Sequence, residues 1–114
     1  MLTNILVLVV AAIHIYIAVL EMVLWESEKG RKVFRNTPEQ AAQSKVMAFN
    51  QGLYNAFLGV GLIFGLWAGL PPMVAFLLIC IGVAGVVGLM SGVRSAFNFQ
   101  TIPAVAALIA LSFT

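Results

Sequence analysis

Charged residues are scarce in this chain. Only 9% of its 114 residues are charged, whereas 62% are hydrophobic, and soluble domains average about 25% charged residues. So short a chain cannot hide that much apolar surface from water inside its own core. A bilayer removes the difficulty, because it surrounds the apolar faces with hydrocarbon. The composition therefore predicts an integral membrane protein and excludes an ordinary soluble domain.

Residues that bind metals or form disulfides are equally few. The one cysteine, Cys80, lies within an apolar run and has no partner for an internal disulfide, so we expect a small buried hydrophobe. A zinc site needs three or four ligands, and His14 with Glu21 does not supply them. Nothing else in the sequence supports His14 as an axial haem ligand. The net charge of +2 comes mostly from one loop. We therefore expect no metal, no cofactor and no nucleic-acid partner.

Four apolar runs predict a single domain, an all-α bundle of four transmembrane helices. A helix of about 20 apolar residues crosses the hydrocarbon core of a bilayer. The last run is short, so its helix begins either at a cap formed by Thr101, with Pro103 in the first turn, or earlier, near Ser95. The expected spans are residues 4–25, 46–68, 73–91 and 98–114.

The segment 27–45 is the only strongly polar part of the chain. Within it, Thr37 as N-cap, Pro38 at the first helical position and Gln40 at the capping-box position predict a helix start. We expect a short helix from Pro38 that runs along the membrane interface and on into the second span. Gly30 is expected to stop any extension of the first helix.

Basic residues occur only in the first and third connections between spans. The second connection, Leu70-Pro71-Pro72, has none. The positive-inside rule therefore places the first and third connections in the cytoplasm and both termini outside. We expect a bacterial inner (plasma) membrane. The basic residues are those at positions 29, 31, 32, 35, 45 and 94.

Glycines recur at helical spacing in two of the spans. In the second span they occupy positions 61, 65 and 69, and in the third span positions 82, 85, 88 and 92. Small residues at such spacing let helix backbones approach closely in membranes. These glycines therefore predict helix packing and make self-association of the protein plausible.

The first span carries two ionisable side chains in its second half. His14 and Glu21 are seven residues apart, which places them two turns and about 10.5 Å apart along one helix face. Charges are costly in hydrocarbon and normally face a bundle interior or a wet cavity. By depth, the polar residues of all spans converge on the cytoplasmic half, which predicts a polar pocket there. The candidate ligand-binding residues are His14, Glu21, Trp25, Asn50, Gln51, Tyr54, Asn55 and Arg94.

Each candidate also has a structural interpretation. The amides and the phenol of the second span could bond to neighbouring helices, at about 0.6 kcal/mol each. Glu21 could pair with Arg94 and hold the bundle in register. His14 could donate to a backbone carbonyl. Trp25 and Trp67 fit the aromatic belts at the two membrane interfaces.

Three stretches together resemble a known family. They are His14–Trp25, the basic loop 28–34, and Asn-Gln-Gly-Leu-Tyr-Asn at 50–55. They resemble a bacterial and fungal family of small four-helix membrane proteins known as a domain of unknown function (number thirteen-oh-four). The resemblance implies the four-helix fold but brings no activity. Small multidrug transporters and membrane-associated eicosanoid and glutathione enzymes are similar in architecture only.

Three functional hypotheses follow from these residues. In the first, the protein binds or transports a small amphipathic molecule, with Glu21 as the ionisable contact and proton carrier and with His14 at the pocket floor. In the second, His14 and Glu21 perform acid–base chemistry on a lipophilic substrate within the membrane. In the third, the chain is a structural or accessory subunit. The expected partners are membrane lipids, the amphipathic ligand and a second copy of the chain.

Overall fold

The computed structural model describes all 114 residues, and every regular element in it is a helix. Four helical segments are long and apolar enough to cross a membrane, which confirms the expected all-α four-span class. The last of them, Arg94–Ser112, joins three elements without a break. The elements are α1 (Leu2–Met22), α2 (Glu28–Phe34), α3 (Pro38–Trp67), α4 (Pro71–Met90), α5 (Arg94–Ala96), the π-helical turn η1 (Phe97–Thr101) and α6 (Ile102–Ser112).

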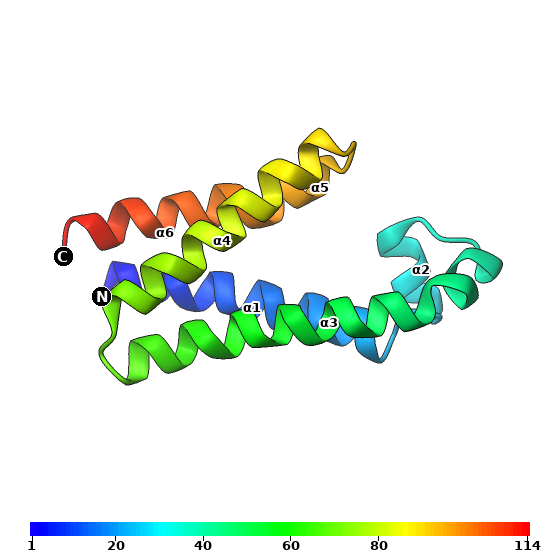
Figure 1. Cartoon of the computed structure of the whole chain (residues 1–114), viewed down its shortest axis with the longest axis horizontal. Helices are drawn as coiled ribbons and strands as arrows, with labels where there is room; N and C mark the ends of the chain where they lie inside the picture. The colour runs from blue at the N-terminus through cyan, green and yellow to red at the C-terminus, as the bar shows by residue number, and fades with distance from the viewer.

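The long helices form two hairpins (Figure 1). One hairpin is α1 with α3, and the other is α4 with the segment Arg94–Ser112. Both chain termini and the α3–α4 turn lie at one end of the molecule, which we call the termini end. The helix α2 and the α4–α5 turn lie toward the other end, which we call the loop end. The molecule is elongated, with extents of 48 × 27 × 18 Å.

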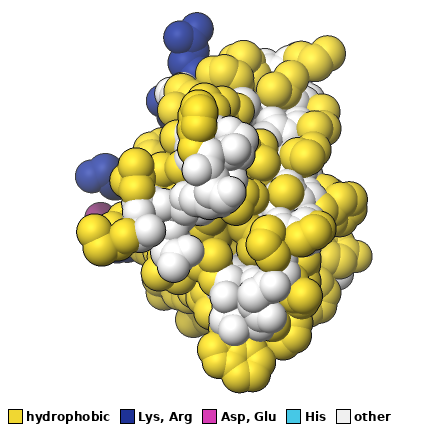
Figure 2. All heavy atoms as spheres, turned by 90° about the vertical axis from the view of Figure 1, so that its left-hand side faces the viewer, with side chains coloured by type: hydrophobic (Ala, Val, Ile, Leu, Met, Phe, Trp, Pro, Cys, Tyr) yellow, Lys and Arg dark blue, Asp and Glu magenta, His cyan; other side chains and the backbone are white.

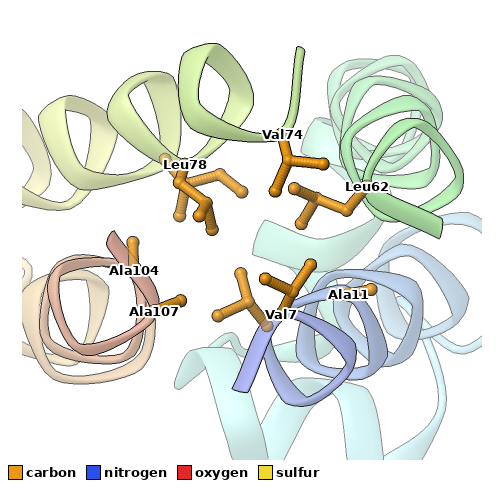
Figure 3. Close-up of a cluster of buried hydrophobic side chains, with 9 residues drawn as sticks. Val7, Ala11, Leu62, Val74, Leu78, Ala104 and Ala107 are labelled. Carbon is orange, nitrogen blue, oxygen red and sulfur yellow. The ribbon is translucent and has the colours of Figure 1, made fainter. Parts of the chain in front are cut away.

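The core lies where the two hairpins meet, in the half of the molecule nearer the termini end. Figure 3 shows side chains from α1, α3, α4 and α6 pointing toward a common centre. Outside this cluster most apolar side chains remain exposed, and hydrophobic side chains cover most of the termini end in Figure 2. An exposed apolar surface of this extent fits a lipid environment. The buried cluster consists of Val7, Val10, Ala11, Leu62, Val74, Leu78, Ile81, Ala104 and Ala107.

Glycines set the spacing between α1 and α3. A Cβ atom on Gly59 would lie 2.9 Å from the carbonyl oxygen of Ala11, and one on Gly52 would lie 3.1 Å from that of Ala18. The two glycines are seven residues apart and share one face of α3. Neither was among the glycines expected to pack.

The expected glycines of the second span face α4 instead. A Cβ on Gly61 would meet Leu77, and one on Gly65 would meet Val74, so packing at these two positions is confirmed. Gly69 is different, because it follows the end of α3 with φ +67°, and a Cβ there would meet nothing within 4 Å. It forms the turn into α4.

The π-helical turn explains how α4 packs on the last span. The backbone N–H of Ile102 bonds to the carbonyl of Phe97, five residues earlier, so residues five apart share a face here, whereas in an α-helix they diverge. Ala96 and Thr101 are five apart, and both lie against α4. A Cβ on Gly88 would meet Ala96, and one on Gly85 would meet Thr101.

Thr101 does not cap the last helix. It is buried inside the continuous segment Arg94–Ser112, and its hydroxyl donates to the carbonyl of Gly82 at 2.8 Å. The cap prediction was therefore wrong, and the alternative of an earlier start near Ser95 is confirmed. The hydrogen bond of the Thr101 hydroxyl is therefore made to the neighbouring helix α4.

The first loop also differs from expectation in part. The helix α1 ends at Met22 rather than near residue 25. Ser27 caps α2 by accepting a hydrogen bond from the backbone N–H of Gly30 at 3.1 Å, so Gly30 lies inside α2 and does not terminate α1. Its missing side chain lets α2 lie directly on the carbonyls of Leu24 and Trp25.

The capping box at the start of α3 is confirmed. The Thr37 hydroxyl accepts from the Gln40 N–H, and the Gln40 side chain accepts from the Thr37 N–H. From Pro38 the helix continues without a break to Trp67, over 30 residues. The short helix of the first loop is therefore α2, which lies earlier in the loop than expected.

Candidate functional site

A buried carboxyl group lies between α1 and α3. Glu21, on the last turn of α1, is 5% exposed, and its Oε1 accepts a hydrogen bond from Asn55 Nδ2 at 2.6 Å. Gly52 makes this contact feasible, because a Cβ at this position would lie 3.0 Å from the Cβ of Glu21. Arg94, the partner considered from the sequence, is exposed on the other hairpin and forms no ion pair with Glu21. The amide of Asn55 takes that place.

A cavity of about 340 Å³ opens beside Glu21 toward the loop end. It lies between the end of α1, the turn that follows it, and the early turns of α3. Its lining combines two carboxylates and one ammonium group with apolar side chains. The lining residues are Glu21, Met22, Val23, Trp25, Glu26, Ser27, Lys45, Val46 and Phe49.

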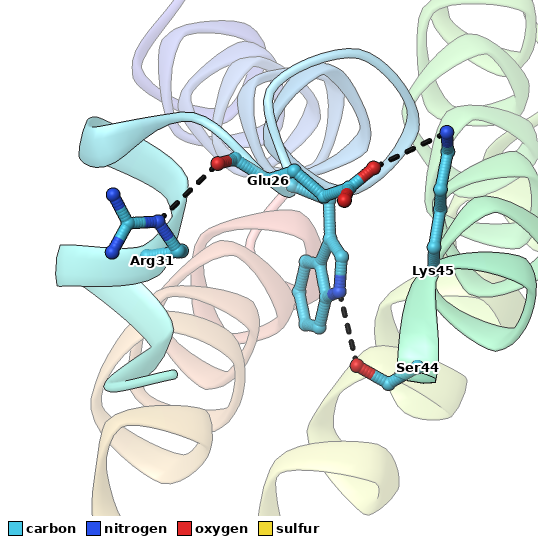
Figure 4. A network of polar contacts seen from close by, with 5 residues as sticks. Glu26, Arg31, Ser44 and Lys45 are labelled. Atoms are coloured by element: carbon cyan, nitrogen blue, oxygen red, sulfur yellow. Dashed lines mark hydrogen bonds and ion pairs between the residues drawn. The ribbon is translucent and has the colours of Figure 1, made fainter. Parts of the chain in front are cut away.

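Polar contacts connect the residues at the rim of this cavity (Figure 4). The indole N–H of Trp25 donates to the Ser44 hydroxyl at 3.1 Å. Lys45 Nζ lies 3.2 Å from Glu26 Oε1, and Arg31 Nε donates to the Glu26 carbonyl at 3.3 Å. The ion pair is exposed, so it contributes at most about 1 kcal/mol. Together these contacts tie the turn after α1 to α2 and α3.

Trp25 has a more specific role than a membrane anchor. Besides its bond to Ser44, its ring lies 4.8 Å from that of Phe34 in α2, centroid to centroid. It therefore forms a wall of the cavity. Trp67 stays exposed at the end of α3, as expected for an aromatic belt.

His14 lies apart from the cavity. It is completely buried, and its Nδ1 donates to the carbonyl of Val10 at 2.9 Å, which agrees with its structural interpretation. The side chain of Gln100, in η1, lies beside the imidazole, but Nε2 makes no hydrogen bond. His14 and Glu21 therefore occupy separate places along α1.

The comparisons with known proteins found one match. A family model described as a protein of unknown function (DUF1304) matches residues 8–112. The chain belongs to this family. The comparisons with curated proteins and with solved structures found no match. The DUF1304 match takes in the whole cavity lining and all of the four long segments except the first six residues of α1, so it confirms the resemblance noted from the sequence.

In this DUF1304 chain, the remaining predicted residues lie away from the cavity. Asn50, Gln51 and Tyr54 are exposed along α3, and Arg94 is exposed at the start of the last span. Of the amides expected to converge, only Asn55 meets Glu21. The position of a residue along the helix does not tell which side of α3 faces α1.

The rim contacts of Ser44, Lys45 and Glu26 were missed. None of the three was among the candidate binding residues named from the sequence. A signal was present in the spacing, because Lys45, Ala48, Gly52 and Asn55 follow one another at three, four and three residues. That spacing defines one helix face, and the small residues on it mark the side on which α1 packs.

Proposed function

We propose that this protein binds a small amphipathic molecule with a cationic head group in the cavity between α1 and α3. The observation that carries the proposal is the buried Glu21 carboxyl at the cavity wall. A carboxylate offers about four acceptor positions, and Asn55 occupies one. The lining holds two carboxylates, from Glu21 and Glu26, but one ammonium group, from Lys45. A cationic head group would balance this excess of negative charge.

The rest of the lining suits the apolar part of such a ligand. Met22, Val23, Val46 and Phe49 supply hydrocarbon and aromatic surface beside the charged groups. Ligand pockets in proteins span about 300–1,000 Å³, and a cavity of about 340 Å³ lies at the small end of this range. Methionine adapts its shape to different ligands. The ligand is therefore a small amine rather than a whole phospholipid.

A transport version of this function uses the same carboxyl group. A cation and a proton compete for Glu21, so uptake of one releases the other, and binding weakens as the solution becomes more acidic. With the orientation inferred from the basic residues, the cavity opens toward the cytoplasm. We do not favour the acid–base enzyme, because His14 is absent from the cavity lining.

Tryptophan fluorescence offers a direct test. In a Trp67→Phe background, Trp25 is the only tryptophan and lies in the cavity wall. Titration with a short alkylammonium probe, hexylammonium, should give a saturable change in emission. Glu21→Gln keeps the shape of the side chain and removes its charge, so we expect at least tenfold weaker binding.

The matched control is Glu39→Gln, which removes an exposed carboxylate in the first turn of α3. It should bind the probe as the parent protein does. Native mass spectrometry of protein extracted from its own membrane should show a retained amine that Glu21→Gln loses. Equal probe affinity in the parent and in Glu21→Gln would rule out this function.

A further inference from the structure

One face of α3 carries uncharged residues that nothing in the chain covers. They are spaced four, three, four and three residues apart, which places them on one side of the helix. Met47, Tyr54 and Phe57 are 75%, 57% and 59% exposed. We call this set the α3 stripe, and its members are Gln43, Met47, Asn50, Tyr54 and Phe57.

The polar members of the stripe have no partner within the chain. Side-chain hydrogen bonds in α3 and its cap are made by Thr37, Gln40, Ser44 and Asn55. None is made by a stripe residue. Lipid tails offer neither donors nor acceptors, so an uncovered amide or phenol in hydrocarbon costs free energy.

The depth of α3 places part of the stripe in hydrocarbon. Its 30 residues span about 45 Å at 1.5 Å per residue, whereas the hydrocarbon core is about 30 Å thick and takes about 20 residues. Counted back from the exposed Trp67 at the termini end, the hydrocarbon begins near residue 48. Asn50 and Tyr54 therefore lie within it.

The divergence of the two hairpins explains why this face is bare. The stripe continues toward the termini end through Gly61, where Leu77 of α4 covers it. Toward the loop end, the glycines of α4 face the last span instead of α3, with Gly85 against Thr101. Figure 1 shows α4 and α5 leaving α3 toward the loop end. The half of this α3 face that lies nearer the loop end therefore has no neighbouring helix.

We propose that a second copy of this chain covers the α3 stripe, with the two α3 helices parallel and related by a two-fold axis along the membrane normal. Alternation of four and three residues is the heptad spacing by which two helices interlock. In a two-fold pair, equal depths meet, so Asn50 faces Asn50 and Tyr54 faces Tyr54.

The chemistry of the stripe favours an identical partner. An amide and a phenol each carry a donor and an acceptor, so each can bond to its own copy. A charged residue would repel its copy, and the stripe from Gln43 to Phe57 has none. A single buried asparagine is known to set register and partner number in paired helices. Asn50 serves this purpose here, and the contact is independent of the ligand cavity.

Cysteine cross-linking in native membranes tests the geometry. Cys80 is first replaced by alanine, which removes the only native cysteine. Asn50→Cys is then compared with Phe49→Cys, an exposed neighbour at the same depth but off the stripe. Oxidation should join most of the Asn50→Cys protein into dimers and at least tenfold less of the Phe49→Cys protein.

Energy transfer between labelled chains in phosphatidylcholine vesicles tests the energetics. On dilution with lipid, Asn50→Leu should dissociate at a protein density at least tenfold higher than the parent. The control Asn4→Leu removes an exposed amide from α1 and should behave as the parent. Preferential cross-linking at Phe49→Cys would overturn the proposal, and so would a parent protein that stays monomeric at every density. A monomer that retains lipid would assign the stripe to a lipid instead.

Discussion

Replacing Gly85 by alanine is expected to separate α4 from the last span and to lower the free energy of unfolding by about 1–3 kcal/mol, the usual cost of overpacking. The added Cβ would lie 2.8 Å from the backbone nitrogen of Thr101 and 2.9 Å from the carbonyl oxygen of Ala96. Backbone atoms cannot swing aside as a side-chain end can. The Thr101 side chain is also held, because its hydroxyl bonds to Gly82. Unfolding in mixed micelles measures the loss.

Gly82→Ala is the matched control for this prediction. Gly82 lies one turn earlier in α4, and a Cβ there has no neighbour within 4 Å. Alanine is the better helix former by about 1 kcal/mol, so this variant should be as stable as the parent or slightly more stable. Equal stability of Gly85→Ala and Gly82→Ala would mean that α4 and the last span are not in close contact.

Replacing Gly52 by leucine is expected to have the second large effect, and this effect extends to binding. Gly52 lies against α1 beside Glu21 and Ala18, so a leucine would push the two helices apart at this level. The hydrogen bond from Asn55 to Glu21 spans the same gap and would break. We expect a loss of about 1–3 kcal/mol in stability and at least tenfold weaker binding of the hexylammonium probe.

Gly61→Leu distinguishes the loss of stability from the loss of probe binding. Gly61 lies on the face of α3 toward α4, where a Cβ would meet the end of the Leu77 side chain at 2.9 Å. Leucine there should also reduce stability, but it leaves α1, Glu21 and Asn55 in place, so probe binding should persist. If Gly52→Leu bound the probe as well as Gly61→Leu, the spacing of α1 and α3 would not control the cavity.

The features that were predictable from the sequence depend on local or additive properties. Hydropathy is a sum over a window of residues, so the four spans follow from the local composition of each window. The capping box at Thr37 is similarly local, because its two hydrogen bonds join residues three apart. These properties do not require knowledge of which helix packs against which.

The features that were not predictable depend on contacts between distant residues. Thr101 carries the local signature of a helix cap, and Gly30 that of a helix stop. Each instead serves a neighbouring element, Thr101 by bonding to Gly82 and Gly30 by letting α2 rest on Leu24. The choice of Asn55 over Asn50 as partner of Glu21 is of the same kind, because it depends on the side from which α1 approaches.

The π-helical turn makes the winding of the residues between Ala96 and Ile102 as important as their identity. If the same residues wound as an ordinary α-helix, Ala96 and Thr101 would diverge by about 140° around the helix axis. The chain could then keep its contact at Gly85 or its contact at Gly88, but not both. Deletion of one residue there, the loss of a single codon, would remove the need for the π turn, because residues four apart share a face of an α-helix.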